Sequence, residues 1–386
     1  MTLHPRTSAP RRLAQVTGLI AVAALGLTAC GNGEGEPTGG DGADDGETYT
    51  FTLAAGALEG TPHSAIEQHY LDLVEERTDG RIEFERTSFE ALCAVDEVIN
   101  CLRDGRADIG TTVTDYTPHM LPTLSVVSIS FLNTDIQATA AALYDMHTDY
   151  EPAREQLEQN NLQYVATWPV GTMFLGSAGP VEKIDDLNGL RARAAGPVTQ
   201  LTLESADINV NAITAPETYE SVQRGVIDSV AAALDFGVNY QIIEQLPYWT
   251  DPGLGQYTAY GMWWSKEAYE SLPEDLREIV GEVTEEMNYG EAIETYNEAM
   301  RDVCDGMLES PDVESFTRWD EDATAEWHDL VGDEAEDLWL EIMDDYGYED
   351  AEAYLEEYKS AYAAHESDDN PVDAGISCVD EWQAAN

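Results

Sequence analysis

Side chains capable of catalysis are present in this chain, but they do not fall into a catalytic pattern. The seven histidines form no H-E-x-x-H pair, and no G-x-S-x-G, P-loop or dinucleotide-binding motif occurs. The 76 Asp and Glu residues are so frequent that two acids at glycosidase spacing carry no information. The sequence therefore favours a protein that binds a ligand without transforming it and needs no cofactor. A cell-surface hydrolase is the weaker alternative.

Arg193 is the residue best placed to bind an anion. In the expected strand 190–195, arginines alternate with apolar residues, so Arg191 and Arg193 share one face. Arg193 lies nearer the carboxyl end of the strand, where open α/β sheets bind ligands, and a guanidinium can hold a carboxylate through two parallel hydrogen bonds. We assign Arg193 to the ligand and Arg191 to a structural ion pair. A structural ion pair is also the alternative for Arg193.

The elements that must position this arginine alternate between strand and helix. The hydrophobic pattern predicts strands at 49–53, 82–84, 107–113, 162–168, 190–195 and 226–234, and helices at 64–80, 95–102 and 216–224. Helical patterns dominate from residue 266 onward. This order predicts an α/β protein with two lobes, each a mostly parallel sheet flanked by helices, and a helical C-terminal region.

The N-terminus has the pattern of an export signal. A basic stretch ends at Arg12, an apolar run covers 13–27, and the sequence L-T-A-C ending at Cys30 is typical of a bacterial lipobox. We expect residues 1–29 to be removed and Cys30 to be acylated, which would anchor the exported protein to the outer face of the cytoplasmic membrane. An uncleaved anchor is the alternative. Residues 30–47, rich in Gly and acids, predict a flexible linker.

The four cysteines that remain after Cys30 are an even set, as expected for an exported protein with disulfides. Three pairings are possible. We favour Cys93–Cys101, which would join the start of a helix to its last turns, and Cys304–Cys378, which would attach the C-terminal segment to an earlier helix. No cysteine belongs to a C-x-x-C motif or lies within a few residues of a histidine, so a metal site is the weaker alternative.

The charge of the chain excludes one class of partner. The formal net charge is −58, and the segment after residue 29 has 15 basic residues against 76 acidic ones, a net of −61. So acidic a surface repels nucleic acid. The acids are spread from Glu34 to Glu381, so we interpret them as a solvated surface adapted to high salt. A surface for cations or basic partners is the alternative.

Several short segments occur in an informative order. They read A-D-I-G at 107–110, D-L-N-G-L-R-A-R at 186–193, P-E-T-Y-E-S-V-Q-R-G-V-I-D at 216–228 and W-S-K-E-A-Y-E-S-L-P at 264–273. Together they resemble the solute-binding proteins of TRAP transporters, the DctP-type family. The resemblance covers about residues 48–310. It implies a two-lobed fold like that of periplasmic binding proteins, which captures an organic acid in the cleft between its lobes.

The resemblance also implies a domain division and partners. Residues 48–169 plus about 259–296 would form lobe I, and residues 170–258 plus about 297–386 would form lobe II with the C-terminal helices. The partners would be the small and large membrane subunits of the permease, to which the protein delivers its ligand. A surface lipoprotein that senses the same ligand is the alternative, because it would use the same fold and pocket.

In this family the arginine at the position of Arg193 pairs with the ligand carboxylate. Sialic-acid binders carry a second arginine where this chain has Met173, and many members carry an asparagine where this chain has alanines at 231–233. These departures favour a monocarboxylate with an apolar or aromatic body. The further pocket candidates are Met173 and four aromatic residues, Tyr116, Trp168, Phe236 and Tyr260.

Overall fold

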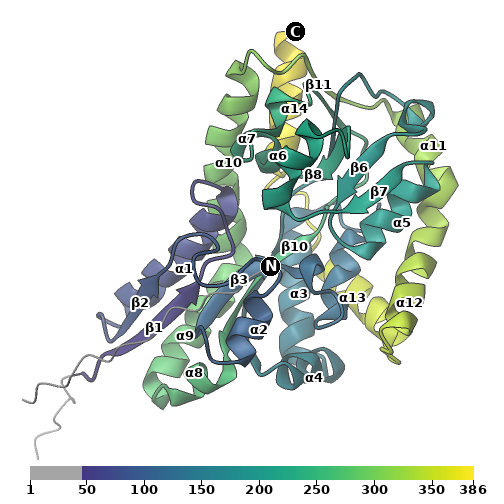
Figure 1. Ribbon diagram of the computed structural model, residues 1–386. Helices are drawn as coiled ribbons and strands as arrows, with labels where there is room; N and C mark the ends of the chain where they lie inside the picture. The colour runs from purple at the N-terminus through teal and green to yellow at the C-terminus, as the bar shows by residue number, and fades with distance from the viewer. Residues whose placement is uncertain (1–45) are drawn as a thin grey trace, which may run out of the picture. The chain divides into compact units, whose positions relative to one another are not determined.

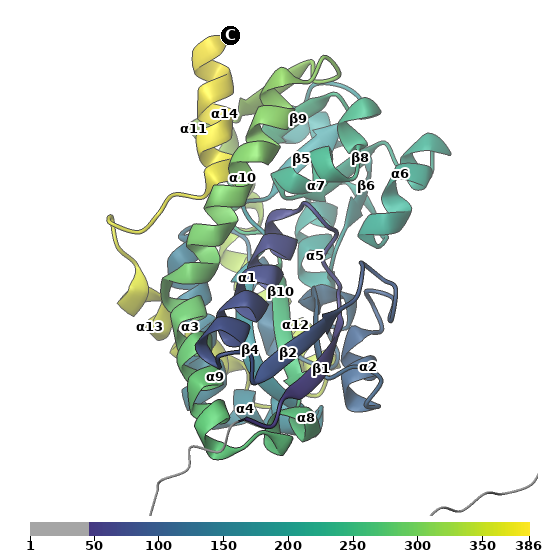
Figure 2. The ribbon, with the colours of Figure 1, turned by 90° about the vertical axis from the view of Figure 1, so that its left-hand side faces the viewer.

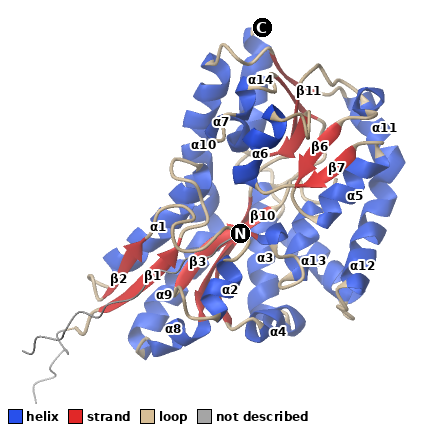
Figure 3. Ribbon diagram, in the orientation of Figure 1, coloured by secondary structure: helices blue, strands red, loops and turns tan. Residues whose placement is uncertain are grey.

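Two mixed β-sheets, each flanked by helices, form the part of the chain that this computed structural model describes, residues 46–386 (Figures 1 and 3). The predicted signal sequence, Cys30 and nearly all of the predicted linker lie outside the described residues. Among residues 46–386, no helix is both long and apolar enough to cross a membrane. The predicted fold class is confirmed, because each sheet contains only one strand that runs against its neighbours.

The first sheet, which defines lobe I, has the strand order β2-β1-β3-β10-β4. Its strands are β1 (Tyr49–Ala54), β2 (Ile82–Arg86), β3 (Ile109–Val113), β4 (Leu162–Pro169) and β10 (Ala259–Ser265). Strand β10 is antiparallel to both β3 and β4. The helices that follow in sequence are α1 (Pro62–Arg77), α2 (Val98–Arg103), α3 (Ile136–Asp149), α4 (Glu151–Gln159), α8 (Lys266–Ser271) and α9 (Glu274–Glu286).

The second sheet, which defines lobe II, has the order β11-β9-β5-β8-β6-β7. Its strands are β5 (Phe174–Ser177), β6 (Arg191–Ala194), β7 (Asn209–Ala212), β8 (Ser229–Ala232), β9 (Tyr248–Asp251) and β11 (Ser315–Arg318). The helices between and after them are α5 (Pro197–Ser205), α6 (Ala215–Gln223), α7 (Leu234–Asn239), α10 (Ala292–Glu309), α11 (Glu321–Val331), α12 (Ala335–Asp345), α13 (Ala351–His365) and α14 (Ala374–Ala385).

Several predicted elements are shorter in the structure, among them the strands expected at 107–113 and 190–195, which are β3 and β6. The strand expected at 226–234 is β8, which covers only Ser229–Ala232. Asp228 lies just before the strand, where its carboxylate accepts hydrogen bonds from the backbone and side chain of Arg191. The helix expected at 95–102 begins at Val98. Both favoured disulfides are present, and Cys93–Cys101 therefore joins the loop before α2 to the helix itself.

The chain crosses between the sheets three times, and two of the crossing segments lie side by side. Residues 170–173 lead from β4 to β5, and residues 252–258 lead from β9 to β10. Backbone hydrogen bonds pair them: Val170 N donates to Thr258 O at 2.9 Å, and Tyr257 N donates to Gly171 O at 3.0 Å. A hinge motion between the lobes would bend this double connection and also the third crossing, the segment from β10 to β11 that contains α10.

The C-terminal helices do not all belong to lobe II, which differs from the predicted division. Helix α13 packs against α3 of lobe I, and α10 lies along α1 while also contacting α7 (Figure 2). On α13, the Tyr358 hydroxyl donates to Asn133 Oδ1 at 2.6 Å, and the Tyr362 hydroxyl accepts from Asp135 N at 2.9 Å. These tyrosines bond to the segment just before α3, so they hold the helix on lobe I.

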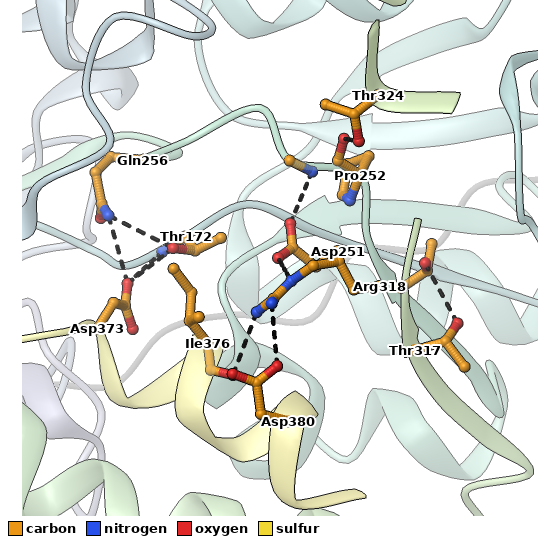
Figure 4. A network of polar contacts seen from close by, with 12 residues as sticks. Thr172, Asp251, Pro252, Gln256, Thr317, Arg318, Thr324, Asp373, Ile376 and Asp380 are labelled. Atoms are coloured by element: carbon orange, nitrogen blue, oxygen red, sulfur yellow. Dashed lines mark hydrogen bonds and ion pairs between the residues drawn. The ribbon is translucent and has the colours of Figure 1, made fainter. Parts of the chain in front are cut away.

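An ion pair attaches helix α14 to β11 of lobe II (Figure 4), and a disulfide joins it to α10. The Arg318 guanidinium contacts Asp251 Oδ2 at 2.9 Å and Asp380 Oδ1 at 3.0 Å. Just before the helix, the Asp373 carboxylate accepts from Thr172 N at 2.7 Å. Together with the disulfide from α10, these contacts bring the C-terminal segment to the crossing at residue 172.

Candidate functional site

A cavity lies between residues of both lobes. Lobe I contributes residues from the start of α1 and from the segment after β3, and lobe II contributes residues from β6, β8 and α7. The crossing segments add Val170, Tyr257 and Thr258. The walls are mainly apolar or aromatic, with a few polar groups, as is typical of pockets for small organic ligands.

Arg193 supplies the positive charge of this cavity. Its side chain extends from β6 and is 2% exposed. Nε donates to Ile213 O at 2.7 Å, one terminal nitrogen donates to the Tyr257 hydroxyl at 3.1 Å, and the other donates to the Tyr116 hydroxyl at 3.2 Å. The guanidinium carbon also lies 4.7 Å from the ring centre of Phe236, within cation–π range.

No carboxylate among residues 46–386 forms an ion pair with Arg193. Arg191, the first residue of β6, is exposed and pairs with Asp228 at 2.8 Å. The three acceptors of Arg193 are all uncharged. A buried guanidinium without an anion is costly, because burial removes the water that would otherwise solvate the charge. The arrangement therefore leaves a buried cation ready to receive an anion from outside the protein.

The two tyrosine hydroxyls beside Arg193 have a proton to spare. Each accepts twice, because Tyr116 also accepts from Ala215 N at 3.0 Å and Tyr257 also accepts from Ala195 N. A phenol oxygen can accept two hydrogen bonds and still donate one. Burial raises the pKa of Tyr257 to about 12, so its hydroxyl keeps this proton at neutral pH. Arg193 and the two phenols thus offer several donors to a carboxylate.

Four of the residues predicted for the pocket line this cavity, and two do not. The lining includes Tyr116, Arg193, Phe236 and Tyr260. Trp168 is fully buried behind the lining and stacks on Tyr260 with ring centres 6.0 Å apart. Its contact with the cavity is indirect, because its indole N–H donates to the lining residue His63.

Met173, the other predicted residue that does not line the cavity, is 3% exposed and belongs to the hydrophobic core. Its backbone N–H donates to Gly255 O at 2.9 Å, which holds it in the paired crossing segments. It sits just before β5, so its side chain packs into the core and not into the cavity. Met173, predicted as a pocket residue, therefore does not line the cavity.

Four ionisable lining residues were not predicted from the sequence: His63, Asp235, Tyr240 and Tyr257. His63 lies in the first turn of α1 and Asp235 in the first turn of α7, while Tyr257 lies in a crossing segment. None belongs to a periodic pattern or a motif that distinguishes it from a surface residue. The one signal that could have identified them is their place in the chain, since each lies close to the end of a helix or strand that faces the opposite lobe.

Residues 55–337 match the family of bacterial extracellular solute-binding proteins, family 7, known as DctP. The chain belongs to this family. Its members are the solute-binding proteins of TRAP transporters, receptors that bind a substrate and do not transform it, and they act in the periplasm with membrane permease components. The likeness inferred from the short sequence segments is thereby confirmed.

One curated relative is the outer membrane transporter protein TsaT of Comamonas testosteroni, which is 21% identical over 225 residues, 57% of this chain and 65% of the relative. The chain spans 33% and 65% of the lengths of the first two curated relatives it matches. Similarity of this extent covers only part of each relative.

Solved structures share the fold at low identity. A TRAP solute-binding protein from Rhodoferax ferrireducens, in complex with copurified benzoate, has a TM-score of 0.74 and 19% identity, covering 82% of this chain and 98% of that one. A marine metagenome TRAP protein described as specific for aromatic acids, in complex with 3-hydroxybenzoate, has a TM-score of 0.72 and 18% identity, covering 83% and 99%. The two-lobed architecture is therefore that of TRAP solute-binding proteins.

Proposed function

We propose that this protein captures an organic acid, a monocarboxylate with an apolar or aromatic body, and delivers it to the membrane subunits of a TRAP transporter. The observation that carries the proposal is the buried guanidinium of Arg193, which forms no ion pair with any carboxylate of residues 46–386. A ligand carboxylate would complete that missing pair. It would also accept the spare protons of Tyr116 and Tyr257.

The walls of the cavity favour the apolar or aromatic body. Phe236 and Tyr260 present their rings, and Val113 and Ala232 add aliphatic surface. Two structural relatives have benzoate and 3-hydroxybenzoate bound, which agrees with this choice although the likeness to them is one of fold. A dicarboxylate would need a second cation, and Arg193 is the only Lys or Arg among the described residues that line the cavity.

The lipobox-like sequence at Cys30 supports an anchored form of the receptor. Acylation there would hold the protein on the outer face of the cytoplasmic membrane, close to the permease. The acid excess supports work in a salty environment, where ions screen the repulsion within the protein. The membrane anchor at Cys30 and the salty working environment are therefore parts of the proposed function.

The test is a thermal-shift and calorimetric panel of mono- and dicarboxylates at high salt, together with mass spectrometry of acids that copurify. We expect an aromatic monocarboxylate to raise the unfolding temperature, because a ligand at a hundred times its Kd adds about 2.7 kcal/mol to stability. Mono- and dicarboxylates of equal size form the matched comparison. If no acid stabilises the protein and none copurifies, the proposal is wrong.

A further inference from the structure

A second charged group, Asp235, lies in the same cavity as Arg193. It is the second residue of α7 and is 4% exposed. Among residues 46–386 its carboxylate accepts no hydrogen bond, and its nearest ionisable partner is His63 of lobe I, with Nε2 3.5 Å from Oδ2. It forms no ion pair with Arg193, so the two charges of the cavity remain separate.

His63 does not neutralise Asp235. Trp168 donates its indole N–H to His63 Nδ1 at 3.2 Å, and an indole nitrogen can only donate. Nδ1 must therefore carry a lone pair, which leaves the single ring proton on Nε2 and the imidazole uncharged. The predicted pocket residue Trp168 thus acts by fixing the state of His63. Asp235 is left with one long contact to a neutral donor.

The hydroxyl groups that surround Asp235 are directed elsewhere. Tyr260 on β10 donates to Gly56 O at 3.3 Å, and Tyr296 on α10 donates to Val170 O at 3.1 Å. The hydroxyl of Tyr240, which also lines the cavity, forms no hydrogen bond within the described part of the chain. Tyr260 and Tyr296 lie against the ring of His63, with ring centres 4.3 and 5.9 Å from it. The carboxylate keeps most of its acceptor capacity open.

We infer that Asp235 is a specificity-determining residue, and that the ligand carries a hydrogen-bond donor, a hydroxyl or an ammonium group, in addition to its carboxylate. The inference rests on the proposed function, in which Arg193 binds the carboxylate. A plain aromatic acid would leave the buried carboxylate of Asp235 unpaired, which is costly. A ligand with a donor at the second position satisfies both charges of the cavity, and an ammonium group also cancels the charge of Asp235.

Calorimetry with a series of benzoates tests this inference on the purified protein. The series consists of benzoate and its hydroxy, methoxy and aminomethyl derivatives, each as meta and para isomers, with the phenylacetates as a longer set. We expect at least one hydroxy or aminomethyl acid to bind about tenfold or more tightly than its parent, because a hydrogen bond to a charged group has that value. The methoxy acid lacks the donor and should gain nothing.

Two variants separate the role of Asp235 from other causes. Asp235→Leu removes every acceptor and should bring the derivatives to within about threefold of the parent acid, the scatter expected without a hydrogen bond. Asp235→Asn keeps an acceptor without the charge, so a hydroxyl preference should persist while an ammonium preference falls. Glu217→Gln, an exposed acid of the first turn of α6, is the matched control and should change nothing.

Distinct results overturn the inference and the proposed function. If parent, hydroxy and aminomethyl acids all bind equally, or if the preference survives in Asp235→Leu, Asp235 does not select the ligand, while the carboxylate site stands. If the methoxy acid gains as much as the hydroxy acid, shape and not donation is recognised. Should Asp235→Leu fail to fold, an unchanged ammonium preference in Asp235→Asn overturns the inference. If no acid binds at all, the proposed function is wrong and this inference falls with it.

Discussion

Arg191 and Arg193 are two residues apart on β6, yet their surroundings differ. Arg191 is exposed and contacts Asp228 through two nitrogens, whereas Arg193 is buried against neutral oxygens. This difference was predictable from position along the strand, because Arg193 lies nearer the carboxyl end of β6, where open α/β sheets bind ligands. The cavity residues Asp235 and Tyr257 were not predictable, because each is an isolated residue whose position in the cavity depends on how the two lobes meet.

Glu67 offers a test at the same scale. It is buried in α1, where its carboxyl accepts from the Thr111 hydroxyl and from Gln68 Nε2, and burial raises its pKa to about 7. A glutamate in the unfolded chain has a pKa near 4.5, so between these values the native state holds a proton that the unfolded state has released. The free energy of unfolding therefore falls as the pH rises through this window.

Glu67→Gln should flatten that dependence, since an amide resembles the protonated acid. Between about pH 5 and pH 8 the parent protein should lose on the order of 1–3 kcal/mol more stability than the variant does. Urea unfolding at several pH values measures the difference. Glu76→Gln, an exposed acid on the same helix, should behave like the parent protein. Parallel pH profiles for Glu67→Gln and the parent would refute the assignment.

At the scale of elements, the alternation of strands and helices through the two sheets could be predicted, since hydrophobic period and turn residues are local signals. The packing of α13 on lobe I could not. It depends on contacts such as Tyr358 with Asn133, which are 225 residues apart. The pairing of the crossing segments 170–173 and 252–258 is likewise a contact between distant parts of the chain.

The short 3₁₀ segment Thr114–Tyr116 after β3 connects the lobes, because the Tyr116 hydroxyl accepts from Arg193 and Ala215 of lobe II. Tyr116→Phe removes both hydrogen bonds and the donor to the ligand. We expect the affinity for the acid to fall about tenfold, with little change in secondary structure. Tyr219→Phe, whose hydroxyl contacts the exposed Glu244, is the control. An unchanged Kd for Tyr116→Phe would remove Tyr116 from the site.

At the scale of the whole molecule, the acid excess acts on every approaching anion. A net charge of −58 repels a carboxylate over long range, while Arg193 attracts it at contact. Salt shortens the range of electrostatic forces from about 8 Å at physiological ionic strength to about 3 Å at 1 M, which weakens the repulsion more than the buried contact.

We therefore predict that affinity for the acid holds or improves as NaCl is added, until chloride competes at Arg193. Titrations across a salt series measure this, with potassium glutamate as a second series to separate screening from chloride binding. A steep, continuous loss of affinity from the lowest salt upward would contradict the prediction, because it would mean that net attraction and not repulsion governs the approach of the ligand.

The central claim, that Arg193 binds the carboxylate of the ligand, is tested most directly by calorimetry on Arg193→Gln and Arg191→Gln, using the acid with the highest affinity from the panel. Arg191→Gln changes a charge on the same strand outside the cavity and should bind within about threefold of the parent protein. Arg193→Gln should keep its circular dichroism spectrum and lose about a hundredfold or more in affinity, since a buried charge pair is lost. A folded Arg193→Gln that binds the acid as tightly as Arg191→Gln would contradict the account.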